Sequence, residues 1–279
     1  MPSTPDDWMV TAFTKLVTLG NSNHSDATGR FPVVSSQGNQ YILVSVFNKY
    51  VHLEPLASRS AESYVKAYKA TFAFFSSLKH RIAVQRLDNE TSALLEDFFR
   101  ANDVSVEYAP AQNHRTVRAE RAIRDAKNHL ISTLATAHPS FPLDMWDRLL
   151  PQVELTLNHL RPFGPNPDIS AYLGVFRQPY DFLAHPIAPC GTLVLVWESP
   201  SIRQSWAPHG VRGFYLGPAV DHYRCWRTWN VYPTRWHGLR NTSSCLAQAH
   251  STTSLRSFPT WLPPTWCIRT IEMRSSSTR

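Results

Sequence analysis

The sequence of 279 residues predicts an α/β protein, with a mixed five-stranded sheet flanked by helices, then a helical extension and a small β module. Three observations predict this class. Apolar, β-branched runs separated by turn signals occur early in the chain. A helical period of apolar residues begins near Ser60, and short strand-like runs then alternate with helical ones to about residue 134. The expected order is three strands, followed by helix, strand, helix, strand and helix.

The first three strands are predicted from turn chemistry and from side-chain alternation. Residues 35–39 contain a Gly-Asn pair, which favours a hairpin. The run 41–47 is apolar and rich in β-branched residues, and residues 51–56 alternate, so both are expected to be strands. A meander of three strands then places Asp26 on the first strand or just after it.

The later elements follow from a change of period. A serine at position 58 or 60 can cap a helix whose apolar stripe extends to Phe75. A strand is expected at 81–87, and Asp88 follows it directly, at the end of the strand where open α/β sheets place their ligand sites. The remaining core elements are expected as a helix over 92–102, a strand over 104–108 and a long helix over 116–134.

Composition divides the chain into five parts. They are an N-terminal extension with one amphipathic helix (1–22), a core (23–140), a helical extension and Pro-rich connector (141–189), a small β module (190–225) and a basic tail (226–279). The extension that follows the core is expected to begin with a helix over 141–160.

The tail carries most of the net charge of +7, because it contains seven Arg and a single acidic residue, Glu272. It shows no sustained helix or strand period, so we expect it to be disordered. Two interpretations fit this composition. One is unselected sequence from a shifted reading frame or a mis-joined exon, and the other is a basic, aromatic arm that binds single-stranded nucleic acid.

The charge and the missing motifs limit the function classes. A basic chain with a pI near 9.4 indicates a polyanionic partner, nucleic acid first. We expect neither a membrane span nor secretion, since no run of about 18 apolar residues and no signal-peptide core occur. The four cysteines form no CxxC pair, which argues against a thiolate zinc site. The G-x-S-x-G and P-loop motifs of hydrolases and nucleotide-binding proteins are absent.

Three carboxylates occupy positions at which metal-ion chemistry can use them. Asp26 lies near the first strand, Asp88 ends a later strand, and Glu120 lies in the first turns of the long helix, with 31 residues between the last two. Carboxylates of this kind can hold two divalent ions that activate an attacking oxygen and stabilise the leaving oxygen in phosphoryl transfer. Mg²⁺ suits an all-oxygen ligand set.

In these passages the sequence resembles the catalytic core of retroviral and copia-type retrotransposon integrases. The matching segments are Asp26-Ala-Thr-Gly-Arg-Phe-Pro, Asp88-Asn-Glu, Asn113-His-Arg-Thr-Val-Arg-Ala-Glu-Arg, residues 141–146 and residues 158–162. The resemblance implies an RNase H-like fold and a D-D-E triad of Asp26, Asp88 and Glu120 that binds two Mg²⁺ or Mn²⁺ ions. The implied reaction is cutting of a DNA 3′ end and its transfer into target DNA.

The resemblance also implies partners and context. It implies that the chain binds the DNA ends of a retroelement and a target DNA, forms a homo-oligomer and is part of a larger polyprotein. Such a protein is expected in the nucleus, with the cytoplasm as the alternative.

The long helix carries a basic stripe that can follow DNA phosphates. Basic side chains recur at every third position, namely Arg115, Arg118, Arg121, Arg124 and Lys127. We expect these residues, with Asn113, to bind nucleic acid, and the resemblance implies that Lys127 touches the DNA end. The alternative for the stripe is a solvated basic face.

One departure from the resemblance leaves a rival hypothesis open. Residues 21–25 before Asp26 are polar, whereas the resemblance implies an apolar strand there. The rival is a catalytically inactive, retroelement-derived remnant that binds nucleic acid. A weaker third hypothesis is another RNase H-like nuclease, which cuts DNA without joining it.

Overall fold

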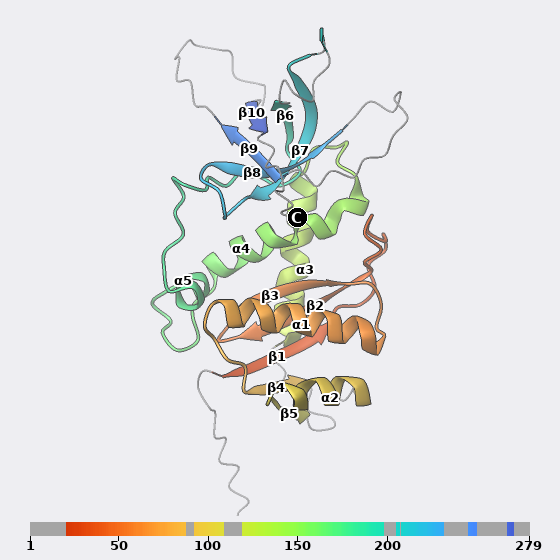
Figure 1. Cartoon of the computed structure of the whole chain (residues 1–279), viewed down its shortest axis with the longest axis vertical. Coiled ribbons are helices and arrows are strands. Elements are labelled where there is room, and N and C mark those ends of the chain that lie inside the picture. The colour runs from red at the N-terminus through yellow and green to blue at the C-terminus, as the bar shows by residue number, and fades with distance from the viewer. Residues whose placement is uncertain are drawn as a thin grey trace, which may run out of the picture.

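A computed structural model gives the architecture of the chain (Figure 1). It describes residues 21–87, 92–108, 119–197, 205–206 and 208–231, together with the backbone of residues 245–249 and 267–270. The helix expected within residues 1–22 and the candidate site residues Asp88, Asn113, Arg115 and Arg118 lie outside this part of the chain.

The core is built on a mixed five-stranded sheet. Its strands are β1 (Ser22–Ala27), β2 (Tyr41–Phe47), β3 (Tyr50–Leu56), β4 (Val84–Leu87) and β5 (Ser105–Tyr108). The spatial order is β3-β2-β1-β4-β5; β2 is antiparallel to β1 and β3, while β4 is parallel to β1 and β5. This order, with helices on both faces, confirms the predicted RNase H-like sheet.

The tight turn between β2 and β3 follows hairpin chemistry. Asn48 and Lys49 both have positive φ, 51° and 69°, and this pair of left-handed residues matches the right-handed twist of the flanking strands. The longer loop from β1 to β2 contains Gly38 at φ 84°, where the Gly-Asn pair predicted a turn.

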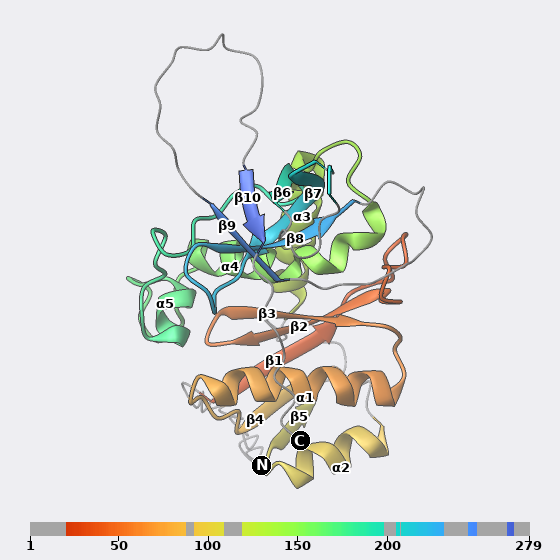
Figure 2. The ribbon, with the colours of Figure 1, turned by 45° about the horizontal axis from the view of Figure 1, so that its top comes forward.

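One face of the sheet is covered by α1 (Ala61–Ser77) and α2 (Ala93–Ala101) (Figure 2). The predicted cap at Ser60 is confirmed, since its hydroxyl accepts a hydrogen bond from the Ser63 amide at 3.3 Å. Ser92 caps α2 in the same way. Aromatic side chains of both helices fill this face, with Phe75 and Phe99 fully buried.

The other face is covered by α3 (Ala119–Thr136), the 3₁₀ helix η2 (Leu143–Leu149) and α4 (Leu150–Leu160). The single helix predicted over 141–160 is therefore wrong in detail. The break falls just before Pro151, which occupies the first turn of α4, where its missing N–H costs no helical hydrogen bond.

The connector contains a short helix that was not predicted from its proline-rich composition. α5 (Ala171–Phe176) is six residues long and is capped by Ser170, whose hydroxyl accepts from the Leu173 amide at 3.1 Å. Its buried residues include Ala171 and Val175, which pack into the same cluster as α1. The helix therefore fixes the connector against the core.

The small β module is a closed five-stranded barrel. Its strands are β6 (Leu193–Trp197), β7 (Gly210–Pro218), β8 (Cys225–Asn230), β9 (Cys245–Ala249) and β10 (Cys267–Thr270), in the order β10-β6-β7-β8-β9. The strands β8, β9 and β10 extend beyond residue 225, the predicted end of the module, into the range that was predicted as a basic tail. Backbone pairing closes the barrel, since β10 contacts both β6 and β9.

The barrel packs on the core through one face of β7, while Val194, Val196, Tyr215 and Trp226 form a separate apolar cluster of the barrel. Cys190, Phe214 and Leu216 belong to the same buried cluster as side chains of α3, α4, β2 and β3. In both views α4 lies between the barrel and the sheet (Figures 1 and 2). No helix among the described residues is long and apolar enough to cross a membrane.

Candidate metal and nucleic-acid site

Asp26 lies near the end of β1, on the face of the sheet that α3 covers. Its strand partner is Val44, which packs in the cluster that contains Ala122 and Ala126 of α3. Facing residues of paired strands share a face, so the Asp26 side chain is on this side too. It is half-buried, and one carboxylate oxygen accepts a hydrogen bond from the Ala27 amide at 2.7 Å.

Glu120 reaches the same side of the sheet from the first turn of α3. The helix packs on β1 and β2 through small residues, since Ala119 and Ala122 are fully buried. Glu120, one position after Ala119, is exposed. A carboxylate in a first helical turn is favoured by the helix dipole and remains available to a cation.

The third carboxylate of the predicted triad, Asp88, lies outside the described residues, directly after the last residue of β4, Leu87. The described residues contain no cluster of three His, Cys, Asp or Glu side chains that could hold a metal ion. The two described members, Asp26 and Glu120, supply oxygen donors only, which fits Mg²⁺ or Mn²⁺.

The polar residues of β1 form an ordered hydrogen-bond chain, which the sequence did not reveal. The Asn23 amide donates to Gln85 Oε1 at 2.9 Å, and Gln85 Nε2 donates to Ser25 Oγ at 2.7 Å. Ser25 Oγ in turn lies 2.5 Å from the Tyr68 hydroxyl. Burial raises the pKa of Tyr68, so the phenol is neutral and can donate.

This chain explains how a polar strand can stand at the centre of the sheet. Asn23, Ser25 and Gln85 are each at most 1% exposed, and their polar atoms bond to one another. The hydrogen-bond chain lies on the face of the sheet that α1 covers, opposite Asp26. The strand partner of Asn23 is Phe47, which packs in the cluster on that face. β1 is paired with β4 over residues 22–24 and with β2 over residues 23–27, so Asp26 lies on an ordered strand that is hydrogen-bonded to β2.

Arg86 is a basic residue beside this site that the sequence did not single out. It pairs in register with His24 on β1, and its guanidinium lies 3.4 Å from His24 Nε2. It also forms a 2.6 Å ion pair with Glu107 on β5. The only sequence signal is one basic side chain in a predicted strand, two positions before Asp88.

The described part of the basic stripe lies on α3. Arg121 and Arg124 are exposed and Lys127 is half-buried. The acidic neighbour Asp125 is already occupied, because Arg161 donates to it at 2.7 Å. Within the described residues, none of the three stripe cations has an ion-pair partner, so their charge is available to a polyanion.

Comparison with solved structures finds similarity to retroviral integrases. The BIV integrase catalytic core is 15% identical, with 57% of this chain and 95% of that chain covered and a TM-score of 0.42. The HTLV-2 core in complex with magnesium, trimeric form, is 18% identical, with 57% and 98% covered and a TM-score of 0.43. A chain of the simian T-cell lymphotropic virus intasome in complex with PP2A regulatory subunit B56 gamma is 13% identical, with 77% and 80% covered and a TM-score of 0.46.

No protein-family model matches the sequence, and no curated protein matches it.

Proposed function

We propose that the chain is the integrase of a copia-type retrotransposon, a metal-dependent polynucleotidyl transferase that processes DNA 3′ ends and joins them to target DNA. Asp26, Asp88 and Glu120 are the proposed metal ligands. The proposed DNA-binding residues are Asn113, Arg115, Arg118, Arg121, Arg124 and Lys127. The expected assembly is a homo-oligomer that acts in the nucleus.

The observation that carries the proposal is that Asp26 and the Glu120-bearing turn of α3 lie on the same face of the sheet. A second relation supports it. The parallel pairing of β1 with β4 joins residues 62 positions apart, such as Ser22 with Val84, and the same offset separates Asp26 from Asp88. In this proposal Asp26 and Asp88 bind the cation together, since carboxylate oxygens are the ligands that it prefers.

Each group has a chemical task in this proposal. Bound Mg²⁺ or Mn²⁺ ions supply Lewis acidity and activate the attacking oxygen in phosphoryl transfer. The three carboxylates hold the ions and balance their charge. The exposed guanidinium groups of Arg121 and Arg124 bind phosphates along the DNA, which positions the scissile bond without reading its sequence.

The test is a strand-transfer and disintegration assay on branched DNA oligonucleotides with Mn²⁺, comparing the wild type with Glu120→Gln. The matched control is Glu62→Gln, because Glu62 is also an exposed carboxylate in a first helical turn but lies on α1, on the other face of the sheet. We expect joined products from the wild type and the control, and a loss of at least about 100-fold in Glu120→Gln, with DNA binding retained.

Equal activity of Glu120→Gln and the wild type would refute the triad. Cleavage without joined products would favour the simple nuclease. DNA binding without product from any of the folded proteins would favour the inactive remnant.

A further inference from the structure

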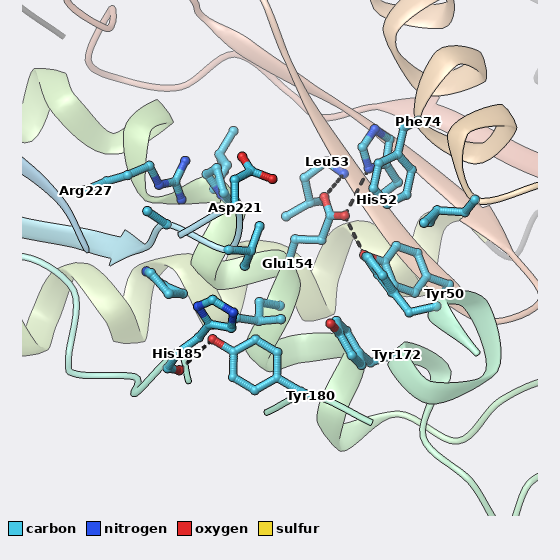
Figure 3. Close-up of a pocket in the computed structure, with 18 of the residues that line it drawn as sticks. Tyr50, His52, Leu53, Phe74, Glu154, Tyr172, Tyr180, His185, Asp221 and Arg227 are labelled. Atoms are coloured by element: carbon cyan, nitrogen blue, oxygen red, sulfur yellow. Dashed lines mark hydrogen bonds and ion pairs between the residues drawn. The ribbon is translucent and has the colours of Figure 1, made fainter. Parts of the chain in front are cut away.

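A cavity of about 840 Å³ lies beside β3, the edge strand of the sheet (Figure 3). Its walls come from β3, the edge strand, from α4 and α5, and from the segment that joins β7 to β8. Because β2 separates β3 from β1, residues of this cavity take no part in the site around Asp26. A cavity of this size can hold one or two extended side chains with their backbone.

The cavity is acidic although the chain as a whole is basic. Five carboxylate residues line it, namely Glu54, Asp147, Glu154, Asp181 and Asp221. The lining contains one arginine, Arg227, and three histidines, namely His52, His185 and His222, of which His52 lies between two carboxylates. An excess of negative charge in a concave surface repels phosphates and attracts cations. The charge of the cavity is therefore opposite in sign to that of the basic face of α3.

The deepest wall is a rigid hydrogen-bonded cluster. Glu154, which is 8% exposed, accepts from the Tyr50 hydroxyl at 2.7 Å, the Leu53 amide at 2.9 Å and His52 Nδ1 at 3.0 Å. His52 Nε2 contacts Glu54 at 3.0 Å. With His52 protonated between two carboxylates, the cluster keeps one net negative charge. Glu54 is half-buried at its edge, so that charge faces the cavity.

Tyr172 presents an unused polar atom to this space. Tyr172 is 8% exposed, and its hydroxyl oxygen points into the cavity between Glu154 and Tyr180 (Figure 3). No hydrogen-bond partner for this hydroxyl exists among the described residues. By contrast, the neighbouring Tyr180 hydroxyl donates to the His185 carbonyl at 2.8 Å. A hydroxyl that lines a cavity and has no protein partner can form a hydrogen bond with a ligand that brings a polar group.

The aromatic rings beside this hydroxyl suit the stem of a cationic side chain. Tyr172 and Tyr180 meet edge to face, with centroids 5.6 Å apart, and Phe74 stacks on His52 at 4.3 Å. Tyr172 is itself stacked between His159 and Phe176, so the rings form a rigid apolar wall along which the methylene stem of lysine or arginine can lie. The carboxylates then neutralise the charge of that side chain, and the Tyr172 hydroxyl can accept its N–H.

We propose that this cavity binds a basic peptide segment of a partner protein, which inserts a lysine or arginine side chain between Tyr172, Glu54 and Asp221. Charge complementarity selects this occupant, because nucleic acid and acidic peptides carry the wrong sign. The described residues contain no cluster that could hold a metal ion, and the lining combines aromatic rings with carboxylates. The site serves recruitment of a protein and is separate from DNA chemistry.

The test is isothermal titration calorimetry of the whole chain with the peptide acetyl-Gly-Lys-Gly-Lys-Gly-amide. The ligand control is the same peptide with both lysines acetylated, which removes the charge and keeps the stem. The protein variants are Asp221→Asn, Tyr172→Phe and their combination. Asp168→Asn is the matched control, because Asp168 is also an exposed aspartate in a loop but does not line the cavity.

We expect saturable binding of the charged peptide that weakens with salt, and no binding of the acetylated one. Each single variant should weaken binding roughly two- to fivefold and the double variant about tenfold, while Asp168→Asn leaves it unchanged. Asp221 is exposed in a turn, so its replacement tests the site even if Tyr172→Phe fails to fold.

Three results would overturn the proposal. They are equal binding of the two peptides, unchanged affinity in Asp221→Asn and the double variant, and binding of spermidine with no binding of the peptide. The last result would assign the cavity to a small polyamine.

Discussion

Two buried polar clusters hold helices to the sheet, and they differ in charge and in completeness. The β3–α4 cluster, made of Tyr50, His52, Glu54 and Glu154, is ionic, and both oxygens of Glu154 are paired. The β1–β4 cluster, made of Asn23, Ser25, Tyr68 and Gln85, is neutral, and Asn23 Oδ1 has no partner among the described residues.

The two clusters show that buried charged groups and buried neutral groups have different requirements for hydrogen-bond partners. A buried charge must be matched almost fully, since removal of one partner leaves an uncompensated ion in a medium of low polarity. A neutral amide can lose one of its bonds at a cost of about 1–3 kcal/mol, and the strand survives. The charged cluster should therefore be the more sensitive of the two to mutation.

The largest effect is expected for Glu154→Ala. The change removes three accepted hydrogen bonds and leaves His52 with Glu54 as its acidic neighbour, so the free energy of unfolding should fall by about 3–5 kcal/mol. Urea denaturation measures this loss. As the control, Asp97→Ala removes an exposed carboxylate paired with Arg100 and should cost less than about 0.5 kcal/mol. Equal losses in the two variants would contradict the ranking.

The pH dependence of stability tests the charge of the same cluster. Burial alone lowers the pKa of His52, but Glu154 and Glu54 outweigh it and raise the pKa to about 9. Because the folded pKa lies above the unfolded value, the stabilisation is complete below about pH 6.5 and is lost as the pH rises through about 9.

The loss over this window should be on the order of 3 kcal/mol. Urea denaturation at pH 6 and pH 9 measures it, and His52→Gln should flatten the dependence. The same slope in the variant would show that other groups cause it.

The smallest effect is expected in the neutral cluster. Gln85→Leu leaves the Asn23 amide and one side of Ser25 without partners and should cost about 1–3 kcal/mol. Adding Asn23→Val removes the orphaned amide, so the double variant should recover part of the loss. Thermal unfolding of the three proteins measures this coupling. Additive losses would show that the two amides act independently.

Much of the fold was predictable because periodicity and capping chemistry act locally. Strand-like patterns of apolar side chains occur over residues 41–47 and 51–56, and these segments form β2 and β3. The helical period after Ser60 likewise corresponds to α1. The elements that were missed depend on contacts distant in sequence. α5 forms because Ala171 and Val175 pack on the sheet cluster, and β9 and β10 exist through pairing around a barrel.

The positions of the candidate site residues could be predicted where they depend on the order of strands and helices along the chain. The end of a strand and the start of a helix indicated Asp26 and Glu120; Asp26 and the first turn of α3 lie on one face of the sheet, and the role of both carboxylates stays a prediction. The polar residues of β1 were misleading because their partner Tyr68 is 43 residues from Ser25. The cavity lined by Glu54, Tyr172 and Asp221 was not predictable, because its walls come from segments that share no motif.

The apolar cluster shared by the barrel and the core determines how the protein can be divided. Phe214 and Leu216 of β7 are 3% and 6% exposed and cover α4. A chain ending at residue 189 would lack Phe214 and Leu216 and so expose part of this apolar cluster, and we expect such a fragment to aggregate. We therefore expect the sheet core and the barrel to melt as one cooperative unit, so that a substitution in either half lowers the stability of both.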